Sequence, residues 1–167
     1  MIECFRITDY TLVAYPLRAC WEDIAEDGQE FKMPDVINNF YIGILEDGNY
    51  VGYVKVQPLT TVMSELHIVI NKGFRNIKKY AQESIRYGLE QIPECMKVII
   101  NVAETKRGVI HLVESLGFRH QGYNSDSYMM NGKLVAQVQL GITRNEMETL
   151  WQTLEQEQQE QQWQQPQ

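Results

Sequence analysis

The chain has 167 residues, of which 44% are hydrophobic and 22% charged, a composition typical of a globular domain with its own core. Its net charge of −7 argues against an extended nucleic-acid surface, which requires a stripe of basic residues. No apolar run approaches the roughly 20 residues that cross a bilayer, and the first residues lack a signal-peptide pattern. Three widely spaced cysteines predict free thiols and no metal site. We therefore expect a cytoplasmic protein without membrane contact.

The N-terminal part of the chain predicts a strand, a helix and a hairpin. Loosely alternating residues at 3–8 predict the strand, and Asp9 or Thr11 then caps the helix. The apolar face expected for this helix consists of Leu17, Cys20, Trp21 and Ile24. Two further strands at 40–45 and 50–56 flank the sequence EDGN, whose Asp-Gly pair favours a tight hairpin turn.

The middle of the chain predicts a parallel strand–helix–strand unit. The stretch Ser64–Gln91 contains a buried strand, a basic turn and an amphipathic helix. The strand, at 62–70, is apolar on both faces, which is typical of a central position in a sheet. The apolar run KVIINV at 97–102 predicts a second central strand, joined to the first by a right-handed crossover. A third helix follows and ends at Gly117; its apolar face comprises Val109, Leu112, Val113 and Leu116.

Two last strands at 118–130 and 133–142 enclose an Asn-Gly turn. This element order predicts an α/β (α+β) fold, with a mixed central sheet and helices on both faces. From Arg144 the composition changes to an amphipathic helix and a Gln-rich tail, so we divide the chain into a domain at 1–143 and an extension at 144–167.

The C-terminal extension carries one apolar stripe and one isolated tryptophan. These residues are Met147, Leu150, Trp151, Leu154 and, in the polar tail, Trp163. The stripe could dock on the protein's own sheet, on a partner protein or on a second copy, and own-domain packing is favoured for Met147 and Leu150. An isolated tryptophan in a polar tail indicates either disorder or a partner's pocket, and we expect a protein partner or self-association through this extension.

The element order resembles that of the GCN5-related N-acetyltransferases, the GNAT fold, from about Ile2 to Thr143. Two segments carry the resemblance: the strand–basic turn–helix at 64–91, and KRGVIHLVESLGFRHQGY at 106–123, a helix ending in Leu-Gly-Phe before a strand. In that family the turn before the helix receives the coenzyme A pyrophosphate on backbone N–H groups. The resemblance implies acetyl-CoA as the cofactor if the protein is active. It places the cofactor on Ile70, Lys72, Arg75, Asn76, Lys78 and Lys79.

The sequence departs from the family at two places. Aligned on Arg75, the family's two glycine positions hold Lys78 and Tyr80, and we expect the tyrosine to fill space that the cofactor needs. Val113 stands where many members place the tyrosine that protonates the leaving thiolate, and valine cannot do so. Both departures favour a non-catalytic structural, assembly or binding role. The chain is also similar to acetyltransferase-like proteins of tailed bacteriophages, some of them head-assembly or internal virion proteins. That resemblance implies the host cytoplasm or the virion as location.

Two alternatives remain open at this point. One is an active acetyl-CoA-dependent N-acetyltransferase of an unknown amine, in which Glu65 takes the proton from the amine through water, as a strand glutamate does in some family members. A strand carboxylate in an ion pair is the favoured interpretation of Glu65, and His67 shares its strand face. The other alternative is a binding module for another acyl or anionic ligand. The basic cluster of the turn then binds a pyrophosphate or an acidic protein patch, unless it is simply a solvated turn.

Overall fold

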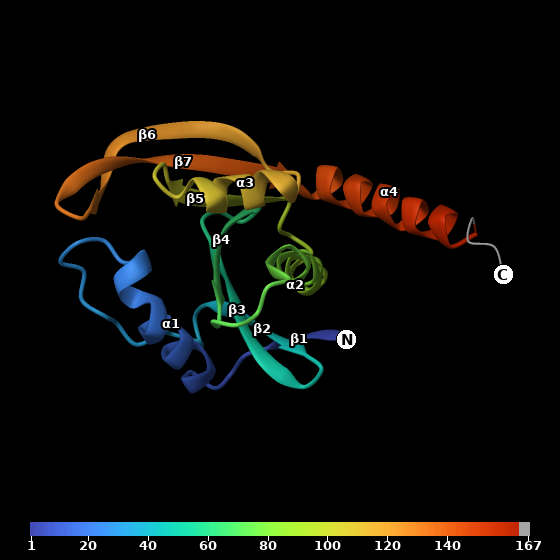
Figure 1. The fold of residues 1–167 in the computed structure, drawn as a ribbon, viewed down its shortest axis with the longest axis horizontal. Helices are drawn as coiled ribbons and strands as arrows, with labels where there is room; N and C mark the ends of the chain where they lie inside the picture. Colours follow the sequence, from blue (N-terminus) through green and yellow to red (C-terminus); the bar gives the residue numbers. More distant parts are fainter. Residues whose placement is uncertain (164–167) are drawn as a thin grey trace.

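The computed structural model describes residues 1–163, and their side chains up to Gln156. This part of the chain forms a seven-stranded mixed sheet with four helices (Figure 1). In chain order the elements are β1 Ile2–Arg6, α1 Thr11–Ile24, β2 Phe40–Glu46, β3 Asn49–Pro58, β4 Met63–Ile70, α2 Ile77–Gln91, β5 Lys97–Ala103, α3 Arg107–Ser115, β6 Arg119–Met130, β7 Lys133–Thr143 and α4 Arg144–Trp163. The predicted mixed α/β architecture is confirmed.

The strands lie in the order β1-β2-β3-β4-β5-β7-β6, and β4 with β5 forms the one parallel pair among the described strands. This pairing covers only three residues of β4, Met63 to Glu65, opposite Lys97 to Ile99. Beyond Glu65 the two strands have no mutual register, and Figure 1 shows them running in different directions. The sheet is therefore split at its centre, and Glu65 lies where the split begins.

The first helix packs largely through the predicted face, since Leu17 and Cys20 lie against the core beside the buried Val13. Asp9 Oδ1 accepts hydrogen bonds from the Thr11 amide at 2.9 Å and from its hydroxyl at 2.7 Å. The prediction that Ile24 belongs to the packed face is wrong, since its side chain is 45% exposed. The reason is that the end of the helix faces the following loop, where the Trp21 ring meets Phe31 edge-on at 5.3 Å.

Proline is accommodated inside α1 by a tertiary contact. Pro16 has no N–H, so the carbonyl of Leu12 has no helical donor. The Tyr50 hydroxyl on β3 donates to that carbonyl at 2.6 Å. The helix thus keeps its backbone satisfied and is fixed to the sheet at the same point.

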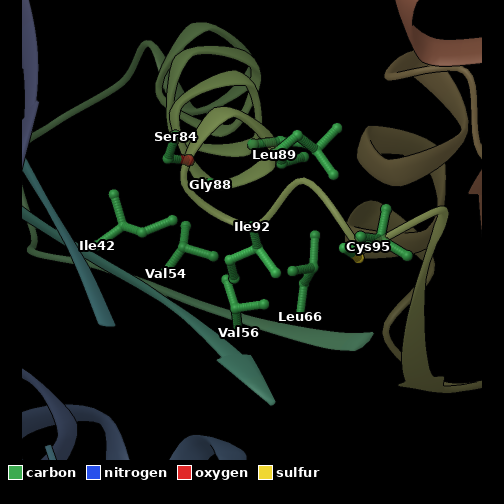
Figure 2. Close-up of a pocket in the computed structure, with 11 residues that line it drawn as sticks. Ile42, Val54, Val56, Leu66, Ser84, Gly88, Leu89, Ile92 and Cys95 are labelled. Carbon is green, nitrogen blue, oxygen red and sulfur yellow. The ribbon is translucent and has the colours of Figure 1, made fainter. Parts of the chain in front are cut away.

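The core lies mainly between α2 and the sheet, and Figure 2 shows a small gap in it. Ile42, Val54 and Val56 point from the strands towards Ser84 and Gly88 of α2. The cavity between them has a volume of about 10 Å³, at the lower limit for one water molecule. The Ser84 hydroxyl donates to the Tyr80 carbonyl at 2.7 Å and does not need a water. We conclude that the cavity is a packing gap and not a ligand site.

The turn between β6 and β7 is tied to the segment after α1, about 100 residues away in the sequence. The Asp27 carboxylate accepts hydrogen bonds from the amides of Asn131 at 3.1 Å and Gly132 at 2.6 Å. Glu26 accepts from the Met129 amide at 2.9 Å, and the Asp27 amide donates to the Met129 carbonyl at 3.0 Å. These bonds join the end of the long hairpin to the segment after α1.

The first turn of α4 belongs to the domain core. The Arg144 guanidinium donates to the carbonyls of Leu89, Ile92 and Cys95 at 2.9–3.0 Å, and Met147 is only 2% exposed. Figure 1 shows the rest of the helix extending away from the sheet. Within the described residues, α4 and the other helices are too short or too polar to cross a bilayer.

Candidate functional site

The turn between β4 and α2 exposes a ring of basic side chains around the start of a helix. Lys72, Arg75, Lys78 and Lys79 are exposed, and Ile70 is half-buried at the end of β4. Helix α2 begins at Ile77 without a side-chain cap, so the first amides of the helix lack partners within it. Among the described residues none of these cations forms an ion pair. Positive charges at a helix N-terminus oppose the helix dipole, and a bound anion would relieve this.

Tyr80 does not occupy the turn, which corrects the expectation from the sequence. Its side chain is 0% exposed and lies under α2, with the ring 6.3 Å from Phe74 in a T-shaped contact. Its hydroxyl donates to Glu46 Oε2 at 2.7 Å, and burial, followed by that hydrogen bond, raises the pKa of Tyr80. The helical period turns position 80 towards the sheet, together with Ala81 and Ser84. The turn thus fits an anionic group of a cofactor at its amides and lysines.

A second cluster of polar side chains lies where β4 and β5 separate, on the face of the sheet opposite α2. Asn101 Nδ2 donates to Glu65 Oε1 at 2.8 Å, and His67 Nε2 lies 3.6 Å from Glu65 Oε2. Gln139 donates to the Asn101 side-chain oxygen at 3.4 Å. The predicted Glu65 and His67 are therefore brought together.

The electrostatics of this cluster favour an ionised Glu65. Its pKa is lowered by the contact with His67, then by the hydrogen bond from Asn101 and by the charge of Lys55, while burial acts in the opposite direction. Burial lowers the pKa of Lys55 in turn, and the Glu65 charge opposes that shift. At neutral pH the carboxylate is charged and already holds fixed partners. It is better suited to organising the cluster than to accepting a proton.

In the second family-like segment, the position where many family members place a proton-donating tyrosine holds a buried valine. Val113 is 4% exposed and belongs to the core cluster beneath α3. The helix ends before Gly117, which has φ +93°, and a Cβ there would lie 2.8 Å from Leu150 Cδ2. Leu150 thus packs on the end of α3, as expected for own-domain packing of α4.

A groove separates the outer face of α2 from α4. Its volume is about 640 Å³, and it is lined by Arg75, Asn76, Lys78, Lys79, Gln82, Glu83, Arg86, Trp151, Leu154 and Glu155. Arg86 closes one part of it, through an ion pair with Glu155 at 3.0 Å and a stacking contact with Trp151 at 5.2 Å. We call this the α2–α4 groove. Sequence patterns assign Trp151 to a stripe and Lys78 to a turn, but only the packing of α4 beside α2 brings them together.

Comparison with known proteins gives a family and a fold. Residues 14–153 match the family model described as protein of unknown function (DUF2824).

The chain belongs to the DUF2824 family. The match includes the first half of α4, and no curated protein matches this DUF2824 chain.

Solved structures resemble this DUF2824 protein throughout the domain. Spermidine N-acetyltransferase from Vibrio cholerae, in complex with CoA and spermine, superposes with a TM-score of 0.71 at 14% identity, covering 87% of this chain and 97% of that one. A putative acetyltransferase from Acinetobacter baylyi gives a TM-score of 0.65 at 17% identity, covering 86% and 92%. These similarities confirm the GNAT fold.

The apolar stripe of α4 divides into two parts in the DUF2824 structure. Met147 is buried in the domain core, and Leu150 packs beside Gly117. Trp151 and Leu154 instead line the α2–α4 groove and remain half-buried. The side chain of Trp163 lies outside the described residues. Trp151 and Leu154 thus stay partly accessible at the α2–α4 groove.

Proposed function

We propose that this DUF2824 protein uses a GNAT fold for binding or assembly and does not transfer acyl groups. The observation that carries the proposal is the state of Glu65. General-base catalysis is most efficient with a pKa near the working pH, whereas the Asn101 amide bonded to Glu65 at 2.8 Å and the His67 beside it lower the pKa of this carboxyl. The buried Val113 supports the same conclusion, because it cannot protonate a leaving thiolate.

The resemblance to phage proteins suggests the kind of partner. A binding or assembly role would then be exercised on another protein of a tailed-bacteriophage head or virion, in the host cytoplasm or the particle. The exposed Arg75 of the β4–α2 turn and the half-buried Trp151 support a protein-binding surface, since arginine and tryptophan are enriched at interfaces.

The competing function is an active N-acetyltransferase that uses acetyl-CoA. It is favoured by the uncapped start of α2 and by the cations around it, which form no ion pair with any described side chain and fit a pyrophosphate. Ile70, Lys72, Arg75, Asn76, Lys78 and Lys79 would hold the cofactor, which supplies the activated acetyl group. Glu65 would then take the amine proton through a water molecule.

An acetyl-transfer assay distinguishes between these two functions. The purified protein is incubated with acetyl-CoA and a panel of polyamines, amino acids and peptides, and release of the free thiol is followed. We expect release at the rate of the protein-free blank for every amine. Turnover by the wild type that is lost in Glu65→Gln and kept in a Glu114→Gln control would establish the acetyltransferase instead, because Glu114 is an exposed carboxylate on α3.

A further inference from the structure

The α2–α4 groove is a positively charged site on an acidic protein. Four basic and two acidic side chains line it, whereas the whole chain has a net charge of −7. Arg86 is paired with Glu155, but Arg75, Lys78 and Lys79 form no ion pair among the described residues. Trp151 and Leu154 add an apolar wall on the opposite side. The groove therefore fits an elongated acidic segment better than a neutral one.

The chain itself contains such a segment. Residues 156–167 include Glu157 and Glu160 but no lysine or arginine, and Trp163 follows three residues after the second glutamate. Helix α4 continues to Trp163, so most of this segment is helical before any partner binds. A preformed helix loses less conformational entropy on docking than a flexible tail. Residues three apart on a helix are neighbours on its surface, which suits Glu157 and Glu160 to a row of cations.

We propose that two copies of the chain associate by exchanging the ends of α4. Residues 156–163 of each copy then lie in the α2–α4 groove of the other, with Glu157 and Glu160 near Lys78 and Lys79. The exchange is reciprocal, so a single two-fold axis relates both contacts and closes the dimer. This inference deepens the binding role proposed above. Its test is separate from the acetyl-transfer assay, so either proposal can fail without the other.

Charge reversal tests the exchange, with sedimentation velocity as the readout. Lys78→Glu/Lys79→Glu makes the groove acidic, and Glu157→Lys/Glu160→Lys makes the segment basic. Each variant alone brings like charges together, so its dimer affinity should fall at least about tenfold. In an equimolar mixture both contacts of the heterodimer are again complementary, and dimers should return. Lys32→Glu/Lys133→Glu is the matched control, since it changes the net charge equally with two exposed lysines outside the groove.

The outcomes separate clearly. A wild-type dimer that weakens at about 0.5 M NaCl, is lost in each groove or segment variant and returns in the mixture supports the exchange. A monomeric wild type at all micromolar concentrations overturns it and leaves the groove to another acidic ligand. A dimer that survives both reversals, or a mixture that stays monomeric, also overturns it. Circular dichroism melting of every variant checks that the substitutions leave the fold intact.

Discussion

Arg144 is expected to hold the domain and α4 together, and its replacement should cost several kcal/mol. The guanidinium donates to the carbonyls of Leu89, Ile92 and Cys95, and the side chain is only 16% exposed. Arg144→Met keeps the aliphatic volume but leaves three carbonyls without this donor. Each lost bond to a charged group is worth about 1.5 kcal/mol at the low end, and water reaching one carbonyl offsets part of the loss. We therefore expect a loss of about 3 kcal/mol.

Urea denaturation followed by circular dichroism measures this loss directly. For a chain of this size, about 3 kcal/mol corresponds to a fall in Tm of roughly 6–12 °C. The matched control is Arg119→Met, which removes an arginine that is 79% exposed and 3.7 Å from Glu146. That change should cost less than about 0.5 kcal/mol, as surface ion pairs do. Equal effects of the two substitutions would refute the reasoning, because burial and carbonyl contacts would then contribute nothing.

Three further predictions concern other parts of the fold. Gly88→Ala should raise Tm, since alanine is about 1 kcal/mol more favourable than glycine in a helix. The Ile42 Cδ1 atom lies 2.9 Å from the position of the new Cβ and can move into the adjacent cavity. A lower Tm would show that the cavity cannot accommodate the displaced Ile42 side chain. Asp27→Asn should speed amide hydrogen exchange at Asn131 and Gly132 by at least about tenfold relative to a Glu22→Gln control, because a charged acceptor is lost. Unchanged exchange would contradict the role of the Asp27 carboxylate in holding the hairpin turn. Because folding lowers the pKa of Glu65, its carboxylate should stabilise the protein at pH values above 4.5, the pKa of the unfolded chain, and this stability should be lost as pH falls through the folded pKa. Glu65→Gln should flatten that part of the curve of unfolding free energy against pH. A curve unchanged by the substitution would contradict the lowered pKa of Glu65.

Local patterns in the sequence predicted most of the fold. The EDGN turn has positive φ at Asp47 and Gly48, and the second hairpin turns at Asn131 and Gly132 in the same way. Periodicity and order also gave the parallel β4–β5 pair and the helices around it. These features depend on residues close in the sequence, so their chemistry is visible without a structure.

The site depends on long-range packing, which the sequence does not reveal. Glu65 and His67 are two apart on one strand, and their proximity follows from the strand period. Asn101 lies 36 residues further along, and nothing in its own sequence context identifies it as the partner of Glu65. Alignment of the turn with the family motif at Arg75 predicts that Tyr80 lies in the turn, but the helical period of α2 places its side chain in the core. The α2–α4 groove likewise depends on the direction in which α4 leaves the sheet. The contacts of Arg144 and Met147 with the core determine that direction.

The most direct measurement of the central claim is a single-turnover experiment. Protein in excess over acetyl-CoA is mixed with the amine panel, and mass spectrometry follows the thioester and any acetylated amine over several hours. If the protein is non-catalytic, the wild type should lose the thioester at the same rate as the protein-free blank and the Glu65→Gln variant. An acetylated amine formed by the wild type, and not by Glu65→Gln, would contradict the account.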